Sequence, residues 1–261
     1  MSPTLIFLLY AMAGTDALNS VTDYPLKQIG CHTYVIYGAI GPPSPRNQGF
    51  VSNTGFVVTS EGVIVIDPGS SVQAGRMVLR RIRSVTDRPV THVINTHSHG
   101  EHWLGNHAIA EAYPDVMILG HYRMVKEGTY INAQDWIEYL EHMTEGFTRG
   151  TGYFPPRESV EGFTKLTSGG ITVLVHALEE SKDSASLVVE IVEDSIAFVG
   201  EEFEVQRFEE SPGFEDFADI AFCEVNTPVK TDFYVPGHGP VGLAGLVECP
   251  YLSGWTGNHS L

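Results

Sequence analysis

The stretch THSHGEHWLGN, Thr96 to Asn106, is the part of the chain that decides the fold. Three of the eleven histidines and one carboxylate fall within His97 to His102, directly after the apolar run Val93 to Asn95. Imidazole and carboxylate groups are ligands of first-row metals, and zinc accepts both. If a strand ends near Thr96 and a helix begins near Trp103, the four side chains lie on one tight connection. We therefore expect them to converge on a metal site rather than to be surface histidines of a polar loop.

The composition predicts a globular protein, and we expect its substrate to be a small molecule. The chain has 261 residues, 32 acidic and 15 basic, and a net charge of −17. So negative a chain repels phosphate backbones, which argues against a nucleic-acid partner. The cysteines Cys31, Cys223 and Cys249 have no CxxC spacing and fit neither a disulfide framework nor a zinc knuckle. No linker divides the chain, so we expect one domain over residues 21–261. The sequence does not indicate an oligomeric state.

Residues 1–20 form a separate segment with two interpretations. Leu5 to Ala13 is an apolar run too short to span a bilayer. It is similar to the hydrophobic region of a secretory signal peptide, with Ala11 to Ala13 as an A-x-A-like cleavage site. This interpretation predicts a periplasmic or secreted protein with no membrane contact once the leader is removed. Because no Lys or Arg precedes the run, a flexible N-terminus or an extra strand is the alternative, and the protein would then be cytoplasmic.

Hydrophobic patterning predicts two β-rich halves. Runs of branched and apolar residues bounded by turn residues indicate strands, and the runs joined by residues 60–62 and by 193–194 indicate hairpins. Helical spacing of apolar residues indicates helices. The predicted strands are 33–37, 55–59, 63–66, 90–96, 116–119, 171–177, 186–192, 195–199 and 233–235, and the predicted helices follow 67–69 and cover 104–112 and 133–143.

The segment 122–165 is different, because aromatic residues stand among polar ones. We interpret it as an amphipathic layer that covers the core, with an aromatic wall beside a ligand pocket as the alternative.

A hydrolytic metal site needs several ligands, a position open to water, and often a carboxylate that orients the water. Candidates stand at the ends of three predicted strands: the cluster 97–102, Glu201 after Val199, and His238 after Val235. This arrangement lets distant segments meet at one rim of a sandwich.

The order of these motifs resembles the metallo-β-lactamase superfamily of metal-dependent hydrolases. The resemblance covers roughly residues 24 to 240: the strands ending at Asp67, the HxHxEH motif of residues 97–102, the pair Gly200-Glu201 and the turn Pro236 to Gly239. The run NTHSH with WLGN is especially similar to bacterial exported members described as quinoprotein-relay zinc hydrolases or as β-lactamase-like. The resemblance implies an α+β protein with a four-layer αββα sandwich, and usually two metals with a bridging hydroxide.

Three positions depart from the family pattern. Glu101 and Glu201 stand where the family usually has aspartate, and each side chain is longer by one C–C bond, about 1.5 Å. We expect that these two changes reflect one enlarged or shifted site. Lys182 stands where the family places a histidine ligand, and a protonated ammonium group cannot bind a metal. His176 is the nearest substitute, although it falls six residues earlier within a predicted strand.

The family roles divide the candidate ligands into two halves. The first half retains His97 and His99 together with Glu201. The second half has Glu101, His102 and His238, again with Glu201. Because only the second half is complete, we predict that it binds its metal more tightly, with one or two metal ions per chain. Zinc is the expected metal, and iron is the alternative.

The resemblance implies a hydrolase in which metal-bound hydroxide attacks the carbonyl of a lactam, lactone, ester or amide, with β-lactams among the substrates considered. Glu101 is expected to orient the water and assist proton transfer, and Lys182 to hold a substrate carboxylate or Glu201. Asp67 is expected to orient a histidine ligand rather than to bind the metal. An iron-dependent sulfur dioxygenase and a catalytically degenerate binding protein are the two alternatives.

Overall fold

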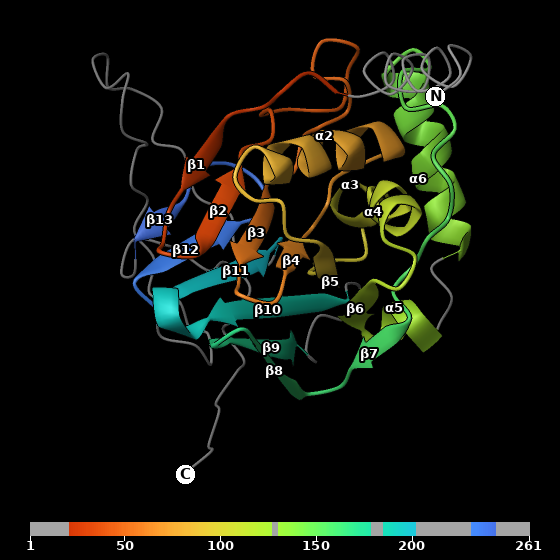
Figure 1. Ribbon diagram of the computed structural model, residues 1–261. Helices are drawn as coiled ribbons and strands as arrows, with labels where there is room; N and C mark the ends of the chain where they lie inside the picture. The colour runs from red at the N-terminus through yellow and green to blue at the C-terminus, as the bar shows by residue number, and fades with distance from the viewer. Residues whose placement is uncertain (1–20, 127–129, 179–184, 202–230, 244–261) are drawn as a thin grey trace, which may run out of the picture.

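Two β-sheets face each other through an apolar interior in the computed structural model of the protein (Figure 1). The structure describes residues 21–126, 130–178, 185–201 and 231–243. The first sheet has seven strands in chain order, antiparallel from β1 to β4 and parallel from β4 to β7. Its strands are β1 (Leu26–Gln28), β2 (Thr33–Ile36), β3 (Thr54–Val58), β4 (Val63–Ile66), β5 (Val90–Asn95), β6 (Met117–His121) and β7 (Glu158–Val160).

The second sheet has six strands in the order β13-β12-β11-β10-β9-β8. All neighbours are antiparallel except β11 and β12, which are parallel. Its strands are β8 (Phe163–Ser168), β9 (Ile171–Leu178), β10 (Ser186–Ile191), β11 (Ile196–Gly200), β12 (Phe233–Pro236) and β13 (Gly242–Leu243), and the 3-10 turn η1 (Val192–Asp194) joins β10 to β11.

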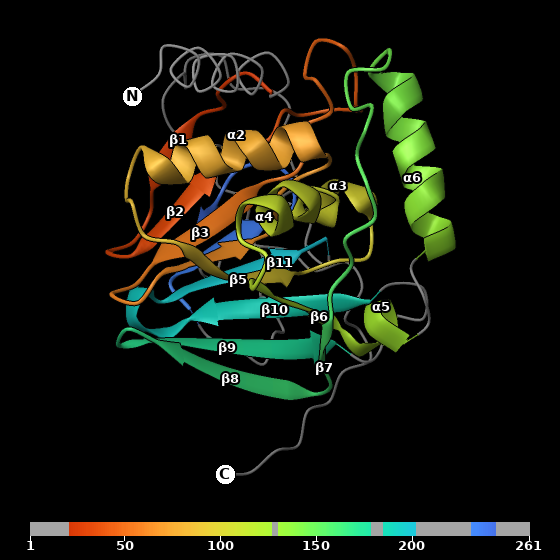
Figure 2. The ribbon, with the colours of Figure 1, turned by 45° about the vertical axis from the view of Figure 1, so that its right-hand side comes forward.

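Helices cover the outer face of the first sheet, and a further helix stands at the side of the molecule (Figure 2). They are α2 (Val72–Arg83), α3 (Gly100–Trp103), α4 (Asn106–Ala112), α5 (Tyr122–Lys126) and α6 (Tyr130–Met143). α2 begins where the Ser71 hydroxyl accepts a hydrogen bond from the Ala74 amide. No helix among the described residues is long and apolar enough to cross a membrane.

Both faces of the first sheet carry apolar side chains, because successive residues of a strand point to opposite faces. In β4, Val63 and Val65 pack toward α2 and α4, whereas Ile64 and Ile66 pack against the second sheet. All four residues are buried, as expected for a strand that is covered on both faces. Because β4 and β5 are parallel, their carboxyl ends lie at the same edge of the sheet. The residues that follow them therefore meet there.

The predicted α+β class with two sheets is confirmed, and so are both hairpins and the helix after residues 67–69. Helix formation begins earlier than predicted: α3 starts at Gly100, not near Trp103, so two of the four motif side chains lie on a helical turn. Short or outward-facing strands were not predicted, namely β1, β7, β8 and β13. Among the described residues, helices cover only the first of the two sheets. The proposed leader, residues 1–20, lies outside the described part of the chain, and so do residues 202–230 and 244–261.

Candidate metal centre

The histidine motif follows β5 and is held close to the second sheet. The Leu187 amide at the start of β10 donates to the Thr96 carbonyl at 2.7 Å. His99 precedes α3 with an extended backbone, and its carbonyl accepts from the His102 amide at 3.1 Å, which closes the first helical turn. The Ser52 hydroxyl donates to the Glu101 carbonyl at 2.6 Å. These hydrogen bonds hold the first turn of α3, which contains Glu101 and His102.

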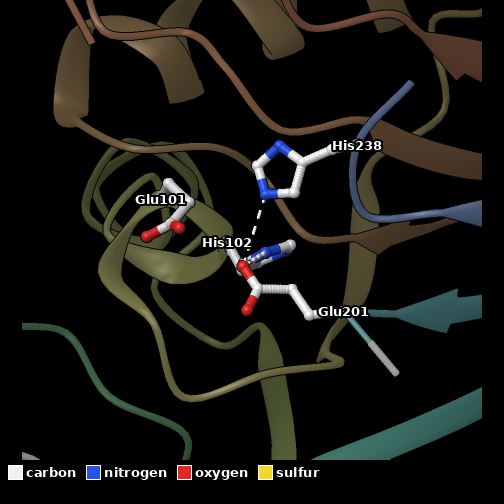
Figure 3. Close-up of side chains that lie close together, drawn as sticks. All are labelled: Glu101, His102, Glu201 and His238. Atoms are coloured by element: carbon white, nitrogen blue, oxygen red, sulfur yellow. Dashed lines mark hydrogen bonds and ion pairs between the residues drawn. The ribbon is translucent and has the colours of Figure 1, made fainter. Parts of the chain in front are cut away.

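Glu201 lies at the centre of the site, at the end of β11 (Figure 3). Its Oε1 atom is 3.2 Å from His102 Nε2 and 3.3 Å from His238 Nε2. Its Oε2 atom is 3.2 Å from His97 Nε2 and 2.9 Å from His99 Nδ1. Each carboxylate oxygen therefore faces two histidine nitrogens.

The donor atoms form two groups that share Glu201. One contains His97 and His99, and the other contains Glu101, His102 and His238; within each group the donor atoms lie within 4.8 Å of one another. These are the two halves expected from the sequence.

Asp67 fixes His102 from the side opposite to Glu201. Its Oδ2 atom is 2.9 Å from His102 Nδ1, and its carboxylate also accepts from the Thr96 amide at 2.7 Å and from the Thr96 hydroxyl. Asp67 is 3% exposed and has φ = +53°, a conformation that non-glycine residues seldom adopt. The expected orienting role of Asp67 matches this geometry. The other ring nitrogen of His102, Nε2, faces Glu201.

His97 is held by Ser186, whose hydroxyl oxygen lies 3.0 Å from His97 Nδ1. Both side chains are buried. Burial lowers the pKa of His97 to about 3, against the opposing effect of the Glu201 charge. His97 is therefore neutral and retains a lone pair for a cation.

Charges and burial pull the remaining pKa values in different directions. Burial raises the pKa of Glu101, whereas the hydrogen bond to Glu201 raises the pKa of His99. Burial lowers the pKa of His102, but the Asp67 carboxylate and the bond to Glu201 outweigh it and hold the pKa well above its usual value. Burial also opposes ionisation of Glu201, yet hydrogen bonds from His102, His238 and His99 keep its pKa far below the usual range. The centre thus holds an ionised carboxylate among imidazoles.

The residues present fit a metal ion. His97 Nε2 and Glu101 Oε2 are buried without a hydrogen-bond partner among the described residues. Buried polar atoms are rarely left without a partner, so such atoms require an explanation, and a bound cation is one. Two ligands of a tetrahedral zinc ion with bonds of about 2.0–2.1 Å stand about 3.3 Å apart. The four distances from Glu201 to the histidines, 2.9 to 3.3 Å, are close to that spacing.

Two further sequence candidates, Lys182 and His176, have different outcomes. Lys182 lies outside the described residues, so its role stays a prediction. His176 pairs with Val188 across β9 and β10, has Glu190 at 3.8 Å, and belongs to neither donor group. His121 is buried at the end of β6, where its Nδ1 accepts from the Arg123 amide at 3.3 Å. His176 is therefore not placed as a substitute ligand.

Asn53 is a supporting residue that the sequence analysis missed. Its Nδ2 donates to the carbonyls of Pro236 at 2.9 Å and Gly239 at 2.8 Å, and its backbone amide donates to Gly237 at 2.7 Å. His238 Nδ1 lies 2.9 Å from the Val51 carbonyl of the same segment. The only signal in the sequence is the polar triplet 52–54 directly before an apolar strand, and Ser186 at the start of β10 gives no stronger one.

Changing Asn53 to Asp is expected to loosen the turn that carries His238. Asn53→Asp removes two N–H donors and puts a carboxylate oxygen against the carbonyls of Pro236 and Gly239, which costs about 1–3 kcal/mol of unfolding free energy. Metal affinity of the half that contains His238 should fall as well. Urea denaturation and zinc titration measure the two effects, with Gln28→Glu, the same amide-to-acid change on the distant strand β1, as control. Unchanged stability and zinc affinity in Asn53→Asp would contradict this role.

Comparison with known proteins places the chain in a family. The sequence model of the metallo-β-lactamase superfamily matches residues 47–244. The chain belongs to the metallo-β-lactamase superfamily. The predicted resemblance is thereby confirmed, and members of this superfamily are generally hydrolytic enzymes. The chain is also 40% identical over 47 residues to a linear primary-alkylsulfatase from Pseudomonas sp. (strain ATCC 19151). That match spans 18% of this chain and only 9% of the sulfatase.

Solved structures of the superfamily share the fold. A metallo-β-lactamase from Pontibacter korlensis superposes with a TM-score of 0.55 and 19% identity, over 85% of this chain and 94% of that one. The inverting sec-alkylsulfatase Pisa1 from Pseudomonas sp. gives 0.56 and 12%, over 85% of this chain and 39% of its own. A B3 metallo-β-lactamase described as the first with an active-site glutamic acid gives 0.52 and 14%, over 89% and 87%. At these identities the likeness concerns the fold, and it confirms the predicted fold class.

Proposed function

We propose that this superfamily member is a metal-dependent hydrolase that cleaves a lactam, lactone, ester or amide at its carbonyl carbon, with zinc as the metal. The observation that carries the proposal is the position of Glu201, which has two histidine nitrogens within 3.3 Å of each carboxylate oxygen. When bound, a metal ion supplies Lewis acidity that activates water and polarises the carbonyl group. His97, His99, Glu101, His102, Glu201 and His238 are the residues that would hold it.

Glu101 is the residue best placed to move a proton. Its Oε2 atom is buried and has no hydrogen bond among the described residues, so it is available to orient a water molecule. Burial raises its pKa, which brings the carboxyl group closer to the range of a general base and acid. The bond from Ser52 to the Glu101 carbonyl fixes the turn that presents this side chain. Glutamate in an active site of this fold has a parallel in the B3 metallo-β-lactamase described above.

A panel of substrates tests the proposal. Metal-depleted protein, zinc-loaded protein and a zinc-loaded Glu101→Gln variant are assayed against lactam, lactone, ester and amide substrates. We expect zinc-dependent hydrolysis of at least one class and a large loss in the variant. If no member of the panel is hydrolysed, the catalytically degenerate binding protein is favoured instead. Iron in freshly purified protein with persulfide-dependent oxygen uptake would favour the sulfur dioxygenase.

Hydrolysis of an alkyl sulfate is a second candidate function. It is favoured by the local identity to a linear primary-alkylsulfatase and by the structural likeness to a sec-alkylsulfatase. Because one fold hosts many reactions, this likeness supports a candidate and not a conclusion. Linear primary alkyl sulfates and secondary alkyl sulfates therefore belong in the same panel, with sulfate release as the measurement.

The two halves of the centre are expected to differ in metal affinity. The half with Glu101, His102 and His238 has three ligands besides Glu201, whereas the other has only His97 and His99 among the described residues. Zinc titration against a competing chelator should give one equivalent bound at least about tenfold more tightly than the second. A tenfold difference in affinity corresponds to about 1.4 kcal/mol, which we expect from the loss of one ligand.

Two variants assign the equivalents to their halves. His238→Ala should remove the tight equivalent, and His99→Ala should leave it in place. Two equivalents of equal affinity in the unmodified protein would contradict the predicted difference.

Lys182 is proposed to hold a substrate carboxylate or the Glu201 carboxylate. Lys182→Ala should then raise KM for substrates that carry a carboxylate, or weaken zinc binding, while Lys182→Arg should retain part of either effect. KM for a charged and an uncharged substrate, together with zinc affinity, distinguishes the two roles. If Lys182→Ala changes none of these quantities, neither role holds.

A further inference from the structure

An aromatic side chain of α6 lies directly against the candidate metal centre. The ring centroids of Trp136 and His99 are 5.3 Å apart, with an angle of 38° between the rings. Gly100 permits this approach, because a Cβ atom there would stand 2.6 Å from Trp136 Cβ and 2.8 Å from Cγ. The glycine inside the histidine motif thus allows the indole to reach the edge of the site.

A second aromatic ring extends this surface. Tyr139 stands one helical turn further along α6, with its ring 5.6 Å from that of Trp136 and nearly perpendicular to it, at 85°. Tyr139 is 42% exposed and Trp136 is half-buried. Ala133 and Leu140 are buried in an apolar cluster with Trp103 and Leu104, and Trp136 packs against the edge of the same cluster. α6 therefore covers the core, as predicted from the sequence. It also carries the ring pair of Trp136 and Tyr139, which we call the aromatic corner.

His99 contacts both Trp136 of α6 and Glu201 of the candidate metal centre. The His99 side chain is 45% exposed, and its Nδ1 faces Glu201 at 2.9 Å. Because the ring centroids of His99 and Trp136 are 5.3 Å apart, Trp136 is a neighbour of any molecule held beside His99. Aromatic rings favour offset-stacked and edge-to-face contacts, and the perpendicular pair offers both.

We propose that Trp136, with Tyr139, forms a subsite for an aromatic ring in the acyl part of the substrate. The inference rests on the proposed hydrolase function and narrows its substrate class to aryl-substituted acyl compounds, such as arylacetyl esters, lactones or amides. Trp136 is a specificity-determining residue in this scheme and takes no part in bond cleavage.

Binding of the corresponding acids tests the subsite without relying on turnover. Zinc-loaded and zinc-free protein are titrated with phenylacetate and with acetate, and the indole N–H signals of the three tryptophans are followed by NMR. Trp136→Phe assigns the Trp136 signal. We expect phenylacetate to bind the zinc-loaded protein about tenfold more tightly than acetate and to shift the Trp136 signal, as stacking and burial of one ring predict.

Variants separate recognition of the substrate from support of His99. Trp136→Leu keeps an apolar side chain beside His99 and should remove most of the preference for phenylacetate while zinc affinity stays within about twofold. Met117→Ala, which removes a 43% exposed apolar side chain at the opposite end of β6, is the control and should retain the preference. If Trp136→Leu instead lowers zinc affinity and both acids bind it equally less well, Trp136 only supports His99 and the inference is overturned.

The failures of the two proposals are distinguishable. Zinc-loaded protein that binds both acids equally would overturn the aromatic subsite and leave the hydrolase proposal standing. Protein that binds no zinc yet prefers phenylacetate, with a shift of the Trp136 signal, would overturn the metal-dependent function and support the subsite.

Discussion

Replacing Glu201 by glutamine is expected to abolish binding of one of two metal ions and to lower hydrolysis about a hundredfold or more. The Oε1 and Oε2 atoms each face one pair of histidine nitrogens. Glutamine retains a single oxygen, so its NH₂ group must face one of the two pairs, and an amide nitrogen does not bind a cation. Loss of a residue that merely supports a ligand already costs about 10- to 100-fold. Loss of a shared ligand should cost at least as much.

The measurement combines metal analysis, zinc titration and kcat/KM. Glu201→Asp should keep part of the binding, because it retains two oxygens on a side chain shorter by one carbon. Glu61→Gln, in the exposed turn between β3 and β4, applies the same chemical change away from the site and should behave as the unmodified protein. Two zinc equivalents bound by Glu201→Gln with unchanged affinities would rule out a shared ligand.

The architecture was predictable from the sequence because its strands are short apolar runs with clear ends. β4 and β10 are examples, since their buried residues are nearly continuous in sequence. β8 escaped prediction because only two of its six residues are apolar, Phe163 and Leu166, and these two do not alternate along the strand. The start of α3 was predicted too late because a hydrogen bond from Ser52, distant in sequence, holds the turn at Glu101.

The candidate metal ligands could be predicted from the sequence, whereas the residues that support them could not. His97, Glu201 and His238 each follow an apolar strand, and the ends of these strands meet at one rim of the sandwich although they belong to two sheets. Asn53 and Ser186 support the site through bonds to segments 89 to 186 residues away. Nothing in local composition specifies such pairings, because they depend on how the two sheets pack. The contact of Trp136 with His99 is likewise a tertiary one, so the sequence of segment 122–165 predicted a covering layer and left an aromatic wall beside a ligand pocket as the alternative.

Asp67→Asn is expected to lower zinc affinity about 10- to 100-fold by changing which nitrogen of His102 carries the proton. With aspartate, His102 Nδ1–H donates to Oδ2 at 2.9 Å, and Nε2, which lies 3.2 Å from Glu201 Oε1, is the nitrogen that would bind a cation. Asparagine can instead donate its own N–H to Nδ1, which places the His102 proton on Nε2 and blocks binding there. Asparagine also tolerates the positive φ of this position, +53°, better than most residues. The variant therefore changes hydrogen bonding without adding backbone strain.

Asp194→Asn supplies the matched comparison, because Asp194 also accepts three hydrogen bonds but does so at the β10–β11 turn, from Cys31, His32 and Thr33. Both variants should lose about 1–3 kcal/mol of unfolding free energy in the metal-free state, since each replaces one acceptor oxygen that faces at least one partly or fully buried donor. Only Asp67→Asn should lose zinc affinity as well. Equal zinc affinities in the two variants would show that Asp67 stabilises the fold without setting the tautomer of His102. Asp67→Ala adds strain at the positive φ and should be less stable than Asp67→Asn, which separates the backbone contribution from that of the carboxylate.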